Sequence, residues 1–280
     1  MSKYINPYTD FGFKKLFREE ASKDLLIDFL NTFLPEKHRI KTLTFRNTEQ
    51  LGPSATDRKA IFDIFCEAES GEKFIVEMQN AKQHYFKDRA LFYAAFPIRE
   101  QGIRGDEWQF ELQAIYFIGI LGFEYDEQEE RRKFQRDVML KDQDGDMFYD
   151  KLRFIFLQMP LFTKTETELK SHRDKWLYFL KNLASFDQIP SILREPIFEQ
   201  AFEAAEIARM DKEELARYEA SLKVYRDNYA VMETQREEGR VEGRAEEKIE
   251  IARNMKKKGY DPVDIAEMTG LSPEEIERLN

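Results

Sequence analysis

Residues 60–79 read AIFDIFCEAESGEKFIVEMQ. Ala60–Cys66 and Lys73–Gln79 are both rich in β-branched and aromatic residues, which predicts two strands. Glu69–Gly71 between them has the composition of a turn, with a glycine that can take a positive φ. The stretch therefore predicts an antiparallel β-hairpin.

The register of this hairpin follows from its turn. The numbers of facing residues in an antiparallel pair have a constant sum, so a loop at Glu69–Gly71 places Glu77 opposite Asp63. Directly opposed side chains lie about 4.5–5.5 Å apart at Cβ. Gln79 points to the same face as Glu77 because side chains alternate along a strand. We therefore predict that Asp63, Glu77 and Gln79 lie together.

The chemistry of the Asp63–Glu77 pair depends on what lies between the two carboxylates. At this separation they repel each other unless a cation is present. Oxygen ligands suit a hard divalent ion, with Mg2+ the first choice and Mn2+ or Ca2+ as alternatives. Such an ion lowers the pKa of a bound water and neutralises charge on a phosphate, which indicates metal-assisted phosphodiester hydrolysis. The pattern alone also allows both residues to lie on the solvated face of a strand.

A succession of short motifs resembles a known family. The motifs are DFGFKKLF at 10–17, LIDFLN at 26–31, DRKAIFDIFC at 57–66, FIVEMQ at 74–79 and YFKDRALFY at 85–93. In this order they resemble the Rpn family of recombination-promoting nucleases and putative transposases, a branch of the PD-(D/E)XK nuclease superfamily. Each motif is short, so the specificity of the resemblance lies in their order.

The resemblance implies a DNA endonuclease with an α/β fold, a restriction-endonuclease-like core whose mixed sheet is flanked by helices. It also implies that Asp63 and Glu77 hold a divalent metal. In the superfamily a lysine usually stands where this chain has Gln79, and that lysine orients or activates the attacking water. A neutral amide can position a water but brings no positive charge. Lys59 and Lys14 are the candidates to supply it.

The net charge of −10 argues against broad electrostatic adhesion to nucleic acid, because affinity for DNA comes largely from neutralised phosphates. A local basic groove remains compatible with this charge. Its candidate residues are Lys14, Lys15, Arg18, Lys82, Lys87 and Arg89. A solvated surface position is the simpler interpretation for all of them except Arg89.

Cysteine usage and hydropathy predict where the protein resides. Cys66 is the only cysteine, so no internal disulfide forms and cytoplasmic residence is expected. No apolar run approaches the roughly 20 residues of a membrane span, and the N-terminus lacks a secretory signal. No membrane partner, zinc spacing or phosphate-binding glycine loop is predicted. His84 follows the Gln79 strand, where a surface turn is the stronger interpretation.

Hydrophobic spacing predicts the remaining elements of the core. Helices are expected at 10–34 and 85–96, and strands at 40–48, 112–123, 133–140 and 151–157. The second helix should stop before Pro97. Asp10 is expected to cap the first helix, with a third metal ligand as its alternative role.

The chain is predicted to have three parts. Residues 1–165 form the nuclease-like core, 166–232 a helical extension packed near it, and 233–280 a connector helix with a small helix-turn-helix-like tail. Arg236–Lys248 repeats charges and glycines every four residues, which fits either a connector helix or a solvated linker. Residues 234–280 carry nine Lys and Arg against twelve Asp and Glu, so an interaction or oligomerisation module is favoured over sequence-specific DNA binding.

Two functions follow from these patterns. The first is a metal-dependent DNA endonuclease of recombination or mobile-element biology, in which Asp63 and Glu77 hold the ion and Gln79 positions the water. Arg89, Lys14, Lys15 and Lys87 would contact DNA. The alternative is a nuclease scaffold with weak or no activity that acts as a DNA- or protein-binding regulatory module.

Overall fold

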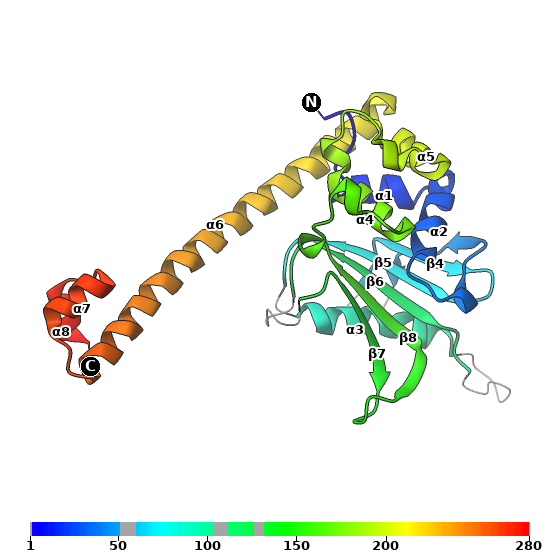
Figure 1. Cartoon of the computed structure of the whole chain (residues 1–280). Helices are drawn as coiled ribbons and strands as arrows, with labels where there is room; N and C mark the ends of the chain where they lie inside the picture. Colours follow the sequence, from blue (N-terminus) through cyan, green and yellow to red (C-terminus); the bar gives the residue numbers. More distant parts are fainter. Residues whose placement is uncertain (1, 51–59, 84, 103–110, 126–131, 280) are drawn as a thin grey trace. The chain divides into compact units, whose positions relative to one another are not determined.

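The computed structural model describes residues 2–50, 60–83, 85–102, 111–125 and 132–279 (Figure 1). The chain divides into two compact units, Met1–Tyr225 and Arg226–Asn280. The first unit is built on a six-stranded sheet with strand order β1-β4-β5-β6-β8-β7. These strands are β1 (Leu43–Phe45), β4 (Ile64–Ala68), β5 (Lys73–Gln79), β6 (Ile115–Leu121), β8 (Met147–Gln158) and β7 (Gln135–Lys141). A separate hairpin pairs β2 (Glu49–Gln50) with β3 (Ala60–Ile61).

The sheet is mixed, as the sequence predicts. β5, β6 and β8 run parallel, while β4 pairs antiparallel with β5, and β7 pairs antiparallel with β8. In the β4–β5 hairpin Ile64 faces Val76, which is the register that sets Asp63 opposite Glu77. Gly71 has a φ of 98° in the connecting turn. The predicted hairpin and its register are confirmed. The single strand predicted over Ala60–Cys66 is wrong, because the strand breaks at Phe62–Asp63 and Ala60–Ile61 pairs with β2 instead.

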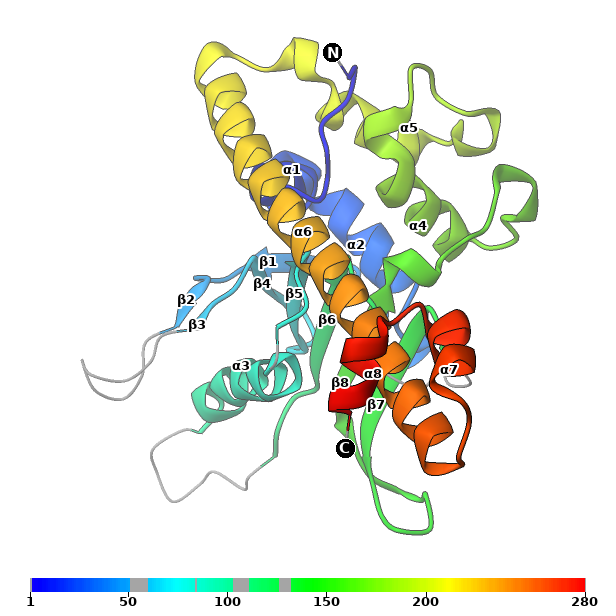
Figure 2. The same cartoon turned by 90° about the vertical axis from the view of Figure 1, so that its left-hand side faces the viewer.

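Helices cover both faces of the sheet (Figures 1 and 2). On one face, α3 (Phe86–Glu100) packs over a cluster that includes Ile75 and Phe117. The opposite face carries α1 (Asp10–Phe17), α2 (Lys23–Asn31), α4 (His172–Asn182) and α5 (Pro196–Ala205). Because side chains alternate along β5, Phe74 and Val76 belong to this second cluster.

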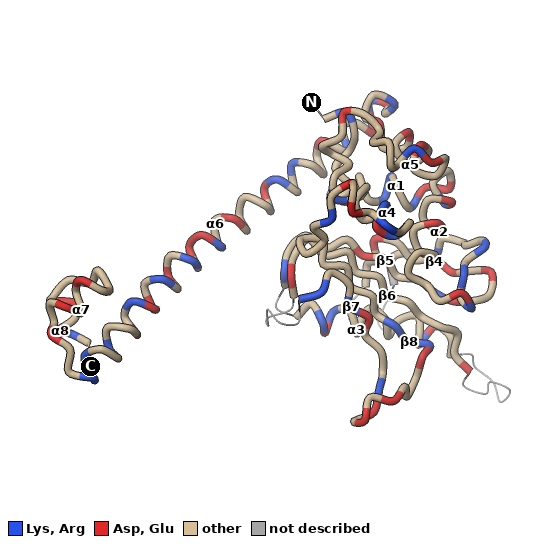
Figure 3. Tube along the Cα trace, viewed as in Figure 1, with Lys and Arg blue, Asp and Glu red and all other residues tan. Residues whose placement is uncertain are grey.

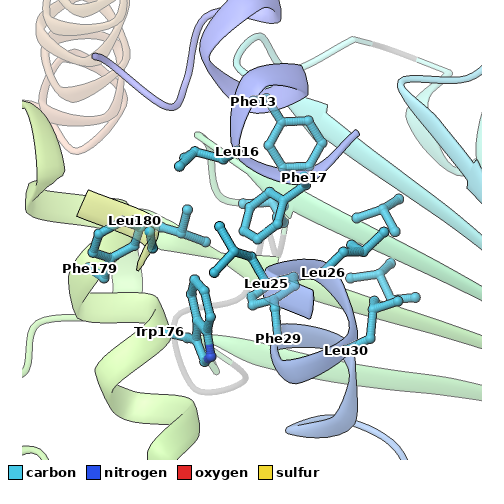
Figure 4. Close-up of a cluster of buried hydrophobic side chains, with 14 of the residues drawn as sticks. Phe13, Leu16, Phe17, Leu25, Leu26, Phe29, Leu30, Trp176, Phe179 and Leu180 are labelled. Carbon is cyan, nitrogen blue, oxygen red and sulfur yellow. The ribbon is translucent and has the colours of Figure 1, made fainter. Parts of the chain in front are cut away.

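Trp176 lies at the centre of the larger cluster. Its ring centroid is 5.8 Å from those of Phe17 and Phe29 and 4.9 Å from that of Phe198. Its indole N–H donates to Asp28 Oδ2 at 2.6 Å. Figure 4 shows the apolar side chains of α1, α2 and α4 pointing toward one another. Helices that follow residue 165 therefore fill the core itself.

The predicted helix at 10–34 is wrong, because the chain forms two helices there. A 3-10 turn at Glu20–Ser22 separates α1 from α2. The buried Ser22 hydroxyl donates to the Lys15 carbonyl at 3.2 Å, which fixes the bend. The bend turns the apolar sides of both helices onto one core, which a single straight helix could not do.

The predicted stop of the second helix before Pro97 is also wrong. α3 continues through Pro97 to Glu100. A proline within a helix removes one backbone N–H donor. Pro97 itself is buried in the helix, and its carbonyl accepts from Gln101 Nε2 at 3.2 Å. Tertiary packing here outweighs the local preference of proline.

A charged cluster links α2, α4 and the start of α5. His172 Nε2 lies 2.5 Å from Asp28 Oδ2, and His172 Nδ1 lies 3.5 Å from Glu195 Oε2. The hydrogen bond to Asp28, together with the charges of both carboxylates, raises the pKa of His172. Burial alone would raise the pKa of Asp28, but hydrogen bonds from His172 and Trp176 outweigh it and hold that pKa below its ordinary value.

We expect this cluster to make stability depend on pH. A histidine whose pKa rises on folding contributes stability that is fully present below its unfolded pKa of about 6.5 and is lost as pH rises through the folded value. His172→Gln should therefore destabilise the protein more near pH 6 than near pH 9. Urea denaturation of both proteins at the two pH values measures this difference. An equal loss at both values would contradict the assignment.

The second unit contains most of a long helix and a compact end. α6 (Lys212–Lys257) is continuous through Gly239 and Gly243, so this segment is helical, and its role as a connector stays a prediction. Figure 3 shows basic and acidic residues alternating along it. No helix within the described ranges combines the length and apolar character that a membrane span requires.

The end of α6 packs with two short helices, α7 (Pro262–Thr269) and α8 (Pro273–Arg278). Ala252, Ile265 and Ile276 form their buried core. Ser272 caps α8 in a capping box, as the sequence predicts. Lys256 Nζ donates to three carbonyls at the end of α8, at 2.6–3.0 Å. This unit therefore has a core of its own.

Candidate metal and catalytic site

Asp63 and Glu77 are held opposite each other by backbone hydrogen bonds. The Asp63 N–H donates to Glu77 Oε1 at 3.0 Å. In return, the Met78 N–H donates to Asp63 Oδ2 at 2.8 Å. Each carboxylate is thus fixed by a backbone N–H at or next to the other acidic residue. The hairpin register that the sequence specifies is what brings these groups together.

Burial gives the pair unusual electrostatics. Glu77 is only 1% exposed, while Asp63 is half-buried. Burial raises the pKa of Glu77 to about 8, and the charge of Asp63 adds to this rise. Burial also raises the pKa of Asp63, against the opposing effects of the Met78 N–H and the Lys14 charge. Burial and mutual repulsion therefore favour a proton on Glu77 near neutral pH.

Arg89 extends from α3 over the pair. Its Nη2 lies 3.4 Å from Glu77 Oε2, and its Nη1 donates to Gln83 Oε1 at 3.0 Å. The Gln79 amide is oriented with its oxygen toward Arg89, because the opposite orientation would set N–H groups against each other. That oxygen accepts from Nη2 at 2.7 Å and from Nη1 at 3.2 Å. Arg89 thus joins Gln79 to Glu77 and stacks over the Tyr93 ring at 5.1 Å.

Helix α1 contributes two further charges, from Asp10 in its first turn and Lys14 in its last turn. Lys14 lowers and Asp10 raises the pKa of Asp63, and Lys14 Nζ lies 2.5 Å from Asp10 Oδ1. The expectation that Asp10 caps this helix is wrong. Thr9 is extended and caps α1, with its hydroxyl accepting from the Gly12 N–H at 3.0 Å. Asp10 is therefore free of the capping role and pairs with Lys14.

Lys15 and Lys87 make contacts with groups other than the Asp63–Glu77 pair. Lys15 Nζ lies 2.6 Å from Glu214 Oε1 of α6. Lys87 Nζ lies 5.5 Å from the centre of the Tyr125 ring. On α3, Lys87 is two residues before Arg89 and points about 200° away from it. DNA contacts by Lys15 and Lys87 stay predictions.

Two of the predicted residues cannot be placed, and one contact at the site was not predicted. Lys59 and His84 fall outside the described residues. The contact of Gln83 with Arg89 could not be predicted, because no sequence motif marks it.

Within the described ranges, no three His, Cys, Asp or Glu side chains gather closely enough to hold a metal. A divalent ion at this site would have two protein ligands, the carboxylates of Asp63 and Glu77. Two carboxylates are enough for Mg2+, because water and substrate phosphate commonly complete its coordination.

Comparison with known proteins decides the family. The family model of the PD-(D/E)XK nuclease family transposases matches residues 7–235. The chain belongs to this family. The model of the Rpn/YhgA-like nuclease family, C-terminal HTH domain, matches residues 245–280. No curated protein and no solved structure gives a match.

Membership of the PD-(D/E)XK nuclease family transposases confirms the fold and the resemblance to Rpn nucleases. The second match confirms that the tail is of the helix-turn-helix type. The match to the nuclease family extends past residue 165 and through α4 and α5. The predicted boundaries at 165/166 and 232/233 stay predictions.

Proposed function

We propose that this chain is a divalent-metal-dependent DNA endonuclease that hydrolyses phosphodiester bonds in recombination or mobile-element biology. The observation that carries the proposal is the opposed pair Asp63 and Glu77, whose carboxylates accept from the N–H groups of Met78 and Asp63 respectively. The close approach and burial of the two carboxylates support a cation at this place, because a divalent ion would offset the repulsion that raises the pKa of Glu77. The family match supports the nuclease class.

Each residue of the site has a role that its chemistry allows. Asp63 and Glu77 would hold the ion, Mg2+ first and Mn2+ or Ca2+ as alternatives. When bound, such an ion supplies charge neutralisation at the phosphate and a lower pKa for a water. Gln79 positions the attacking water through its amide, and Arg89 donates to a phosphate oxygen. Lys14 brings the positive charge that the amide lacks.

Cleavage of supercoiled plasmid tests this proposal. The protein, at less than one molecule per plasmid, should nick it with Mg2+ or Mn2+, and EDTA should stop the reaction. Asp63→Asn keeps the side-chain shape but loses the charge, and should slow cleavage at least about 100-fold, the scale of removing one electrostatic stabiliser. Asp150→Asn is the matched control, because Asp150 forms a partly exposed pair with Lys37 at 2.7 Å. Undiminished cleavage by Asp63→Asn would contradict the proposal.

One observation favours a second function. Gln79 stands at the position of the superfamily lysine, and its oxygen already accepts from Arg89 at 2.7 Å. A scaffold with weak or no activity, acting as a DNA- or protein-binding regulatory module, would have this arrangement. DNA binding without cleavage supports it. A gain of cleavage in Gln79→Lys would then identify the missing charge as the cause.

We also propose cytoplasmic residence and self-association through the C-terminal helices. Cys66, the only cysteine, is a buried free thiol, which suits a reducing compartment. α6 exposes Val231, Val241 and Ile251, which a second copy would cover. Light scattering coupled to size-exclusion chromatography measures the oligomeric state of the full chain.

A further inference from the structure

An exposed tyrosine stands beside the candidate site and has no role in the function proposed above. Tyr85 is 77% exposed and precedes the first residue of α3. Its carbonyl accepts the Arg89 N–H at 2.9 Å, so the two residues are one helical turn apart. Residues at i and i+4 are neighbours on a helix surface. Tyr85 is therefore the surface neighbour of the arginine that covers Glu77.

A second aromatic ring continues this line along α3. Phe92 follows Arg89 by three residues, lies on the same side of the helix and is 42% exposed. Its ring packs edge-on against Phe96, with centroids 5.1 Å apart, which supports it from one side. We call Tyr85, Arg89 and Phe92 the aromatic–cation row. It alternates exposed rings with a guanidinium that contacts the buried carboxylate of Glu77.

The chemistry of the row matches nucleotides whose bases are free. Proteins that bind single strands stack bases on aromatic side chains and pair the backbone with cations. In a B-form duplex the base faces are stacked within the helix, so a ring on the protein surface cannot reach them until a base leaves the stack. A row of this kind beside the proposed nuclease site therefore favours the binding of DNA with unpaired nucleotides over the binding of a duplex.

We propose that the aromatic–cation row binds unpaired nucleotides, with a base stacked on Tyr85 and an adjoining phosphate on Arg89. The substrate class is then DNA that contains a single-stranded segment. This inference rests on the proposed function, because it names the substrate of the same site. Its test uses binding without metal, so that cleavage is measured separately.

Fluorescence anisotropy of the full chain in EDTA and low salt measures the binding. The probes are a fluorescein-labelled thymidine strand and a duplex, each about 20 nucleotides long, which exceeds usual single-strand site sizes. Tyr85→Ala should weaken single-strand binding about 5- to 100-fold, the range for loss of one base–aromatic stack. Duplex binding should change less than about two-fold, because the row has no free base to stack.

Two variants provide controls on α3. Tyr85→Phe keeps the ring and should bind the single strand within about two-fold of the wild type. Leu91→Ala removes an apolar side chain that is 57% exposed on another side of α3, and should leave binding unchanged. Thermal unfolding of each variant shows that the fold is retained.

The inference is overturned by any of three results: unchanged single-strand binding in Tyr85→Ala, an equal loss for strand and duplex, or no single-strand binding by the wild type. The plasmid assay separates it from the proposed function. If the protein cleaves plasmid and Tyr85→Ala does not weaken single-strand binding, the nuclease function is supported and the proposed substrate class is refuted. If the protein binds single strands through Tyr85 but does not cleave plasmid, binding by the aromatic–cation row is supported and the nuclease function is refuted.

Discussion

Replacing Glu77 with Gln should abolish cleavage and make the metal-free protein more stable. The amide keeps an oxygen for the Asp63 N–H, which donates to Glu77 Oε1 at 3.0 Å in the wild type. It removes the buried charge that repels Asp63 and that burial penalises. We expect cleavage to fall at least about 100-fold, because one of two carboxylates is lost. Stability in EDTA near pH 8 should rise by about 1–2 kcal/mol, as when a strained functional site is relieved.

The sign of this effect follows from proton linkage. An acid whose pKa is raised on folding, here to about 8, binds more protons when folded than when unfolded. Wild-type stability therefore falls as pH rises from the unfolded pKa of about 4.3 to the folded value. The advantage of Glu77→Gln should grow across this range and level off above it. Added Mg2+ should shrink it, because an ion that binds only the folded wild type stabilises it.

Glu72→Gln is the matched control on the same hairpin. Burial would raise the pKa of Glu72, but hydrogen bonds from Ser70 and His38 outweigh it and lower that pKa. Here the charge is favourable, so the amide should destabilise the protein. Urea denaturation of the three proteins between about pH 5 and pH 9 gives the comparison. A Glu77→Gln protein that is less stable than the wild type near pH 8 would refute the electrostatic account of the pair.

A chain that stops after residue 165 should fail to fold. It would lack Trp176 and Phe198, whose rings fill the core between α1, α2 and the sheet. Phe17 and Phe29, both fully buried in the complete chain, would lose these neighbours. Loss of a single large core aromatic already costs about 3–5 kcal/mol, a large part of a typical domain's stability.

The matched control for this shortened chain stops after Tyr225, where the first compact unit ends. It retains α4, α5 and the start of α6, and should unfold cooperatively in urea. Near-ultraviolet circular dichroism of both chains measures whether aromatic rings are fixed in a packed core. Cooperative unfolding of residues 1–165 alone would refute this expectation and show that the predicted nuclease-like core is an independent domain.

The sequence allowed the hairpin and its carboxylate pair to be derived because both depend on local geometry. A turn at Glu69–Gly71 and strict alternation are enough to set Asp63 opposite Glu77. The contact of Arg89 with Gln79 could not be derived, since it depends on how α3 packs across the sheet. The charges of Asp10 and Lys14 near Asp63 likewise depend on where α1 is placed.

Element boundaries failed where tertiary packing overrules local preference. The bend before α2 depends on a hydrogen bond from the buried Ser22 hydroxyl, which no apolar period reveals. Pro97 looks like a stop signal, yet it is buried within α3. Trp176 reads as part of an accessory helix, yet it occupies the centre of the core. In each case the deciding partner is distant in the chain.

Cys66 gives this molecule an intrinsic chemical reporter. The thiol is fully buried in β4, three residues after Asp63, and burial raises its pKa above the ordinary value. A thiol is modified only as an accessible thiolate, so a labelling reagent reacts only when β4 opens. With a single cysteine in the chain, the label reads that one strand. The rate of Cys66 modification in native buffer would therefore measure how often β4 opens. Comparing this rate with and without metal or DNA, and among site variants, would show how much each stabilises the hairpin.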